Sequence, residues 1–131
     1  MGKSNMQVIR SSSLIYIPAS HENPDDPGVW KKILLGKEDL FDGQVQMINW
    51  ALLPLGNAFQ PHYHEDMQEV FIVVQGMVTI TVGQETETLT AGDAVAIPAG
   101  SIHTMKNTGK ENVEYVVVGI STGEGGKTIV V

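Results

Sequence analysis

The sequence predicts an all-β fold, an antiparallel sandwich or barrel of many short strands. After residue 44, short runs rich in β-branched and apolar residues alternate with Gly, Pro, Asn and Asp, the usual residues of turns. No segment of that region has the 3.6-residue apolar spacing of an amphipathic helix. Hydrophobic residues make up 42% of the 131 residues and charged residues 18%, which suits one domain with a single core.

The expected strands all lie in the last two thirds of the chain. They occupy residues 44–53, 69–75, 77–82, 87–89, 94–97, 102–107 and 113–121, with a last short run at 128–131. Residues 29–35 fit a strand or one helical turn equally well, and residues 1–28 are expected to form a loose arm. We therefore divide the chain into an N-terminal arm with edge strands (1–43), a β-barrel (44–121) and a C-terminal tail or strand (122–131).

The apolar pattern of these strands also predicts self-association. Residues 77–82 alternate between apolar and polar, as in a strand with one face in the core and one in water. Residues 70–74 and 116–118 are apolar on both faces and need cover on both. Together with the apolar run at residues 14–17, they predict a homodimer, with exchange of the N-terminal arms as one route to it.

Composition excludes several classes of protein. A formal net charge of −7, a pI near 4.9 and the lack of a Lys/Arg cluster disfavour nucleic-acid binding. The absence of cysteine excludes disulfides, thiolate metal sites and cysteine nucleophiles. No apolar run approaches the ~18 residues of a membrane span. The N-terminus lacks the apolar core of a signal peptide, so a cytoplasmic location is expected.

Three histidines and one glutamate form the candidate metal site. His62 and His64 are two residues apart, so on a strand their side chains point the same way. Glu69 opens the next strand, and His103 would reach the same place from a third strand across a narrow barrel. Imidazole binds Zn, Fe, Ni, Cu and Co, whereas an added carboxylate favours Mn or Fe. We expect one divalent ion, Mn or Fe by preference, with Zn, Ni, Co and Cu as alternatives.

The spacing around these residues resembles the two sequence motifs of the cupin superfamily. The first motif reads Gly56-x5-His62-x-His64-x4-Glu69-x6-Gly76, and the second reads Gly92-x5-Pro98-x-Gly100-x2-His103-x3-Asn107. All ten motif positions are filled, and 15 residues separate the motifs, as in small bacterial cupins. The resemblance implies a double-stranded β-helix, or jelly-roll barrel, with the four candidate residues as metal ligands. It covers residues 56–107, extends by strand pattern to about 44–121, and says nothing of residues 1–43.

Residues in phase with these ligands are the candidates for a substrate pocket. They are Gln60, Phe71, Met105, Asn107, Met47 and Asn49. Core filling is the simpler role for Phe71, Met47 and Met105, and a structural role is favoured for Asn107. His21 belongs to no cluster and is expected to be solvated. The pattern places no Lys, Arg or spare carboxylate in the pocket, which favours chemistry performed by the metal itself.

Cupins support many reactions, so the resemblance leaves several functions open. The first hypothesis is a metal-dependent dioxygenase, or an enzyme similar to oxalate oxidase or decarboxylase, that acts on a small anionic or chelating substrate. The first alternative is a non-catalytic, metal-dependent module that binds a small metabolite or sugar. The second is a sugar isomerase or epimerase, which requires a cationic or acid/base residue near the metal, delivered by residues 1–43.

Overall fold

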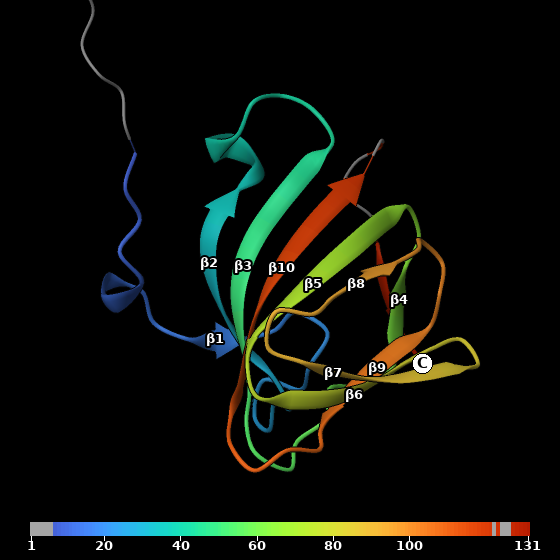
Figure 1. Cartoon of the computed structure of the whole chain (residues 1–131). Helices are drawn as coiled ribbons and strands as arrows, with labels where there is room; N and C mark the ends of the chain where they lie inside the picture. The colour runs from blue at the N-terminus through green and yellow to red at the C-terminus, as the bar shows by residue number, and fades with distance from the viewer. Residues whose placement is uncertain (1–6, 122, 124–126) are drawn as a thin grey trace, which may run out of the picture.

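The structure, a computed structural model, describes residues 7–121, 123 and 127–131 and is built of antiparallel strands (Figure 1). The strands are β1 (Ile17–Pro18), β2 (Trp30–Gly36), β3 (Val45–Leu53), β4 (His62–His64), β5 (Met67–Gln75), β6 (Met77–Val82), β7 (Glu85–Thr90), β8 (Ala94–Ile97), β9 (His103–Asn107), β10 (Val113–Ser121) and β11 (Thr128–Val130). Two single turns of 3-10 helix, η1 (Ser11–Ser13) and η2 (Lys37–Asp39), are the helical elements of the described residues. None of the helices in that part of the chain is long and apolar enough to cross a lipid bilayer. The all-β prediction is confirmed.

Two sheets form the barrel and face each other across the core. The larger has the strand order β1-β2-β3-β10-β5-β8, and the smaller has the order β11-β4-β9-β6-β7. Strands distant in sequence lie side by side, since β10 pairs with both β3 and β5. From β3 to β11, most consecutive strands lie in different sheets, so the connections pass repeatedly from one sheet to the other. This arrangement is the double-stranded β-helix that the resemblance implied.

Apolar residues of alternate strand positions fill the space between the sheets. Leu53, Val73, Val78, Met105 and Val113 are among the most deeply buried side chains. On β6 the alternation holds, with Val78 and Ile80 in the core. The four glycines of the two motifs, and Gly83, all have positive φ, which a residue without a Cβ adopts without strain.

The outer face of the larger sheet is apolar and is not covered by the smaller sheet. Val116 is paired with Trp50 on one side and Ile72 on the other, so these three side chains share a face. Ile72 is 39% exposed and its neighbour two residues on, Val74, is 45% exposed. The prediction that β5 and β10 have two apolar faces is thus confirmed, and one of those faces meets solvent in a single chain.

Residues 29–35, left open by the sequence, belong to a strand of the larger sheet. β2 pairs with β3, and its register places Lys31 opposite the buried Ala51. Because side chains alternate, Lys31 points into the barrel and Lys32 points out. The Nζ of Lys32 donates to the backbone oxygen of Ser11 on the outer side, 2.9 Å away. The segment before the first motif therefore contributes a cationic side chain to the barrel interior.

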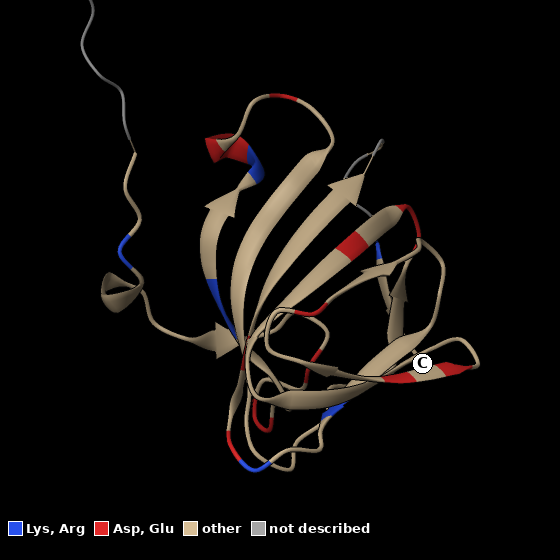
Figure 2. Ribbon diagram, in the orientation of Figure 1, with Lys and Arg blue, Asp and Glu red and all other residues tan. Residues whose placement is uncertain are grey.

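Acidic positions lie mainly on η2, β7 and the loops, whereas the few basic positions of the described residues are scattered (Figure 2). β5 differs from this pattern, because its acidic position, Glu69, faces the buried side of the strand. A buried carboxylate needs a charged or hydrogen-bonding partner, so such groups are expected close to Glu69.

Candidate metal centre

The structure brings His62, His64, Glu69 and His103 together at one end of the barrel. His62 and His64 alternate on β4, and His103 begins β9 directly opposite His62 in the register. Glu69 reaches them from β5 of the other sheet. All four side chains are buried, and one ligand atom from each lies within 4.8 Å of the others. A single ion can therefore contact all four.

Glu69 makes the closest contacts within this cluster. Its Oε1 lies 2.9 Å from Nε2 of His64 and 3.3 Å from Nε2 of His103. The rings of His62 and His103 have centroids 4.3 Å apart. The carboxylate therefore lies beside the ring nitrogens that point to the centre of the cluster.

Backbone carbonyls fix the proton position on two of the imidazoles. Nδ1 of His62 lies 2.7 Å from the Gln60 carbonyl oxygen, and Nδ1 of His103 lies 3.0 Å from that of Ser101. A carbonyl accepts only, so each Nδ1 carries the proton and donates it. In the neutral rings, Nε2 then presents a lone pair to the centre, as in metal-binding histidines.

This arrangement leaves His103 without a donor partner. Its Nε2 is buried and has no hydrogen-bond partner among the described residues. The group it faces, Oε1 of Glu69, is another acceptor. Two buried acceptors in contact need a cation between them, and a divalent metal ion bound by three imidazoles and a carboxylate satisfies both. The four residues therefore fit the ion that the sequence predicted.

Protonation states at neutral pH also suit metal binding. Burial raises the pKa of Glu69, but its contacts with His103 and His64 outweigh that effect and lower the pKa to about 2. Burial, reinforced by the neighbouring charge of His21, lowers the pKa of His62 to about 3. Glu69 is therefore an anion and His62 is neutral, and these are the forms that bind a metal.

Thr128 positions the remaining imidazole of the cluster. β11 pairs with β4 so that Thr128 lies opposite His64, and its Oγ1 lies 2.9 Å from Nδ1 of His64. Replacing Thr128 with Val keeps the shape and removes this hydrogen bond. We expect Mn²⁺ affinity, measured by calorimetry, to fall by about 10-fold to 100-fold. Thr128→Ser retains a hydroxyl and should bind the ion nearly as tightly as the unmodified protein does. Equal Mn²⁺ affinity in the Val and Ser variants would show that the Thr128 hydroxyl does not contribute to the site.

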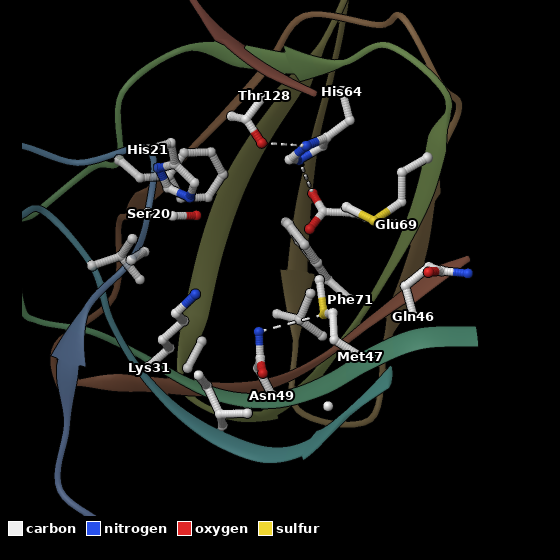
Figure 3. Close-up of a pocket in the computed structure, with 18 of the residues that line it drawn as sticks. Ser20, His21, Lys31, Gln46, Met47, Asn49, His64, Glu69, Phe71 and Thr128 are labelled. Carbon is white, nitrogen blue, oxygen red and sulfur yellow. Dashed lines mark hydrogen bonds and ion pairs between the residues drawn. The ribbon is translucent and has the colours of Figure 1, made fainter. Parts of the chain in front are cut away.

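A cavity of about 500 Å³ opens beside the cluster (Figure 3). His64 and Glu69 line it, together with side chains from β2, β3, β5 and β10. The volume falls in the range of small-molecule sites. The cluster therefore has access to a space large enough for a small organic ligand.

The predicted pocket residues divide into two groups. Met47, Asn49 and Phe71 line the cavity. The other three candidates lie elsewhere, which corrects the pocket prediction for Gln60 and agrees with the core role of Met105 and the structural role of Asn107 that the sequence favoured. Met105 is buried in the core, and Asn107 donates to the carbonyl oxygens of Leu53 and Glu111 instead. The side chain of Gln60 is exposed, and only its backbone takes part, through the carbonyl that holds His62.

His21 is not solvated, contrary to the prediction. Its side chain is 14% exposed, and its ring stacks on His62 with centroids 3.8 Å apart. Nδ1 of His21 lies 2.7 Å from Oε2 of Glu22. Burial lowers the pKa of His21 more than Glu22 raises it. The buried Glu22 carboxylate also accepts from the backbone N–H groups of Gly28 and Gln60, and so it fixes this loop against the strand that carries His62.

The cavity also contains a cationic side chain, contrary to the prediction that no Lys or Arg would be there. Lys31 lines it from β2, and Lys37 and Glu38, a spare carboxylate that the prediction also excluded, lie at its exposed rim. Alternation along residues 29–35 would have suggested the inward orientation of Lys31 once that segment was known to be a strand. His21, Glu22 and Thr128 had no comparable sequence signal, since their roles depend on contacts distant in sequence.

Comparison with known families agrees with this geometry. Residues 49–119, more than half of the chain, match the family model described as a Cupin domain. The chain belongs to the cupin family. The matched region contains the four clustered residues and most of the strands that form the walls of the cavity. The first two strands and the His21–Glu22 loop lie outside it.

Curated relatives of this cupin match it over a limited length. The chain is 38% identical over 63 residues to a mannose-1-phosphate guanylyltransferase from Salmonella montevideo. That match covers 48% of this chain and 13% of the relative. A second mannose-1-phosphate guanylyltransferase, from Salmonella muenchen, is 33% identical over 79 residues, which cover 60% of this chain and 17% of that protein. This cupin therefore spans less than a fifth of the length of these relatives.

Solved structures match the fold over most of the chain. A predicted oxalate decarboxylase from Thermotoga maritima superposes with a TM-score of 0.77 at 26% identity, covering 88% of this cupin and 99% of that chain. A sugar phosphate isomerase of the cupin superfamily from Silicibacter pomeroyi gives a TM-score of 0.70 at 22% identity, with coverage of 88% and 76%. The second likeness, at that identity, shows the fold alone.

Proposed function

We propose that this cupin is a metal-dependent enzyme that acts on a small anionic or chelating acid by oxidative cleavage or decarboxylation. One observation supports this proposal most. The buried acceptor atoms of the four clustered side chains converge on a single point in the wall of a cavity, and a lysine side chain lines the same cavity. The likeness to a predicted oxalate decarboxylase at 26% identity supports the same reaction class.

His62, His64, Glu69 and His103 would hold the ion, and Mn or Fe suits a site of three imidazoles and one carboxylate. Such an ion would supply Lewis-acid polarisation of a bound carboxylate and electron exchange with a substrate or dioxygen. These four ligands would leave part of the ion accessible to a small chelating acid. Phe71 and Val117 make part of the cavity wall apolar, which limits the water around the substrate.

A screen for gas exchange tests this proposal. Protein loaded with Mn²⁺ or Fe²⁺ is offered small carboxylic acids and diketones while oxygen uptake and CO₂ release are recorded. We expect metal-dependent turnover of at least one acid, and its loss when Glu69 is replaced by Gln. Tightly held zinc with no exchangeable position, and no gas exchange with any compound, would contradict the proposal.

Lys31 specifically favours a second candidate, a sugar isomerase or epimerase. That reaction needs a group that binds or moves a proton near the metal, and Lys31 comes from the segment where such a residue was expected. Incubating the loaded protein with sugar phosphates in deuterated water, and following deuterium incorporation by NMR, separates the two reactions. Ligands that raise the melting temperature but undergo neither reaction would instead indicate a binding module.

We also infer that two chains associate through the outer face of the larger sheet. Val70, Ile72 and Val74 of β5, with Val116 and Val118 of β10, make this face apolar. In soluble proteins, a continuous apolar face of a sheet is generally covered by another chain or sheet. Sedimentation velocity at micromolar concentration should give twice the chain mass of 14.2 kDa. A clean monomer would overturn the inference.

A further inference from the structure

Lys31 faces the cavity without a partner that would neutralise it. Among the described residues, no carboxylate lies within ion-pair distance of its Nζ. Its side chain is half-buried, and burial lowers its pKa while the charge of Glu69 acts in the opposite direction. A lysine kept in a cavity without a counter-ion is suited to bind an anion.

Asn49 lies next to Lys31 on the same inner face. The register pairs Lys31 with Ala51 and Ile33 with Asn49, so the two polar residues are diagonal neighbours on β2 and β3. The amide is buried (7% exposed), and its Oδ1 has no hydrogen-bond partner among the described residues. Within the described part of the chain, the hydrogen-bond partner of its Nδ2 is the Met47 sulfur, at 3.4 Å, a weak acceptor. The Nδ2 group, which has only this weak acceptor among the described residues, can therefore donate to a ligand in the cavity.

These two side chains lie across the cavity from the metal cluster. Figure 3 shows the Lys31 amine directed inward beside Asn49, while Glu69 and His64 lie on the opposite side. The formal charges also suit a dianion. A divalent ion with Glu69 and neutral imidazoles has one net positive charge and Lys31 adds a second, while the charges of Lys37 and Glu38 at the rim cancel.

We propose that Lys31 and Asn49 form a second binding position for the distal carboxylate of a diacid whose other end chelates the metal. The inference rests on the proposed function and narrows it. The substrate is then a dicarboxylic acid longer than two carbons, bound at both ends of the cavity. Lys31 acts as a specificity-determining residue, with Asn49 donating a second hydrogen bond to the same carboxylate.

Matched pairs of ligands test this position without any need for turnover. The probes are 2-hydroxybutanedioate against 2-hydroxybutanoate, and the corresponding five-carbon pair, 2-hydroxypentanedioate against 2-hydroxypentanoate. Each pair has the same metal-chelating hydroxy acid and differs only in the distal carboxylate. Binding to the Mn²⁺-loaded protein is measured by calorimetry for the unmodified chain, Lys31→Met, Lys31→Gln and the control Lys32→Met, whose lysine points out of the barrel.

The unmodified protein should bind the diacid of at least one pair about tenfold more tightly than its monoacid. Both Lys31 variants should lose this preference and keep the monoacid affinity, while Lys32→Met keeps both. Equal binding of diacid and monoacid, or a preference that persists in a folded Lys31 variant, would overturn the inference and leave the proposed chelation intact. Failure of the loaded protein to bind any of the four acids would count against both.

Discussion

Replacing Glu69 with Gln is expected to reduce the affinity for Mn²⁺ by more than about 100-fold, because loss of an outer hydrogen-bond partner alone costs about 10-fold to 100-fold. Glu69 supplies the negative charge of the cluster, and its Oε1 lies beside two ring nitrogens. An amide oxygen carries no net charge and binds a divalent ion much more weakly. Calorimetric titration of the metal-free protein with Mn²⁺ measures the loss.

The same variant gives a second, independent result in the absence of metal. Without the ion, Oε1 of Glu69 still lies 2.9 Å from Nε2 of His64 and 3.3 Å from Nε2 of His103. The melting temperature of metal-free Glu69→Gln should fall below that of the unmodified metal-free protein, because the lowered pKa of Glu69 means that its anionic form stabilises the fold at neutral pH. Glu65→Gln, at an exposed position of the preceding turn, is the matched control and should change neither quantity. Retained Mn²⁺ affinity in Glu69→Gln would refute the assignment of Glu69 as a ligand.

Replacing Glu22 with Ala is expected to lower the free energy of unfolding by about 2–4 kcal/mol, since several hydrogen bonds to a buried carboxylate are lost together. The Glu22 side chain is 2% exposed and lies 2.7 Å from Nδ1 of His21. It also accepts from the backbone N–H groups of Gly28 and Gln60, both at 2.8 Å. Chemical denaturation followed by circular dichroism gives the difference.

Variants at neighbouring positions show whether the effect belongs to the carboxylate. Glu22→Gln keeps the volume but turns one acceptor into a donor that faces an N–H group, so it should also destabilise the fold. Asp25→Ala removes an exposed carboxylate of the same loop and should be neutral. Because Gln60 also holds His62, Glu22→Ala should weaken Mn²⁺ binding as well. A Glu22→Ala protein as stable as the Asp25 control would show that this loop does not support the site.

The metal cluster is predictable because its members follow local rules. Strand alternation brings His62 and His64 to one side, and the motif spacing identifies Glu69 and His103 as their partners. Residues 77–82, 94–97 and 113–121 form strands with the predicted bounds, since turn glycines and β-branched runs mark their ends. The local sequence pattern was therefore sufficient to predict a strand where its apolar periodicity and the turn residues beside it indicate the same bounds.

The residues around the cluster were not predictable from local pattern. Lys31 points inward because of the pairing of β2 with β3, and seven residues do not distinguish such a strand from a helical turn. His21 is buried through Glu22, whose partner Gln60 is 38 residues away. In-phase position alone also did not separate pocket from core for Met105, because a strand of a closed barrel has inner positions that face the core rather than the cavity.

The central claim, that His62, His64, Glu69 and His103 bind one divalent ion at the wall of the cavity, is tested most directly by metal analysis. The protein is purified without chelator, its metal content is measured by mass spectrometry, and the same is done for His103→Ala. We expect close to one equivalent of Mn or Fe per chain in the unmodified protein and almost none in the variant. The absence of a bound ion from the unmodified protein under metal-replete conditions, or equal metal content in the two proteins, would contradict the claim.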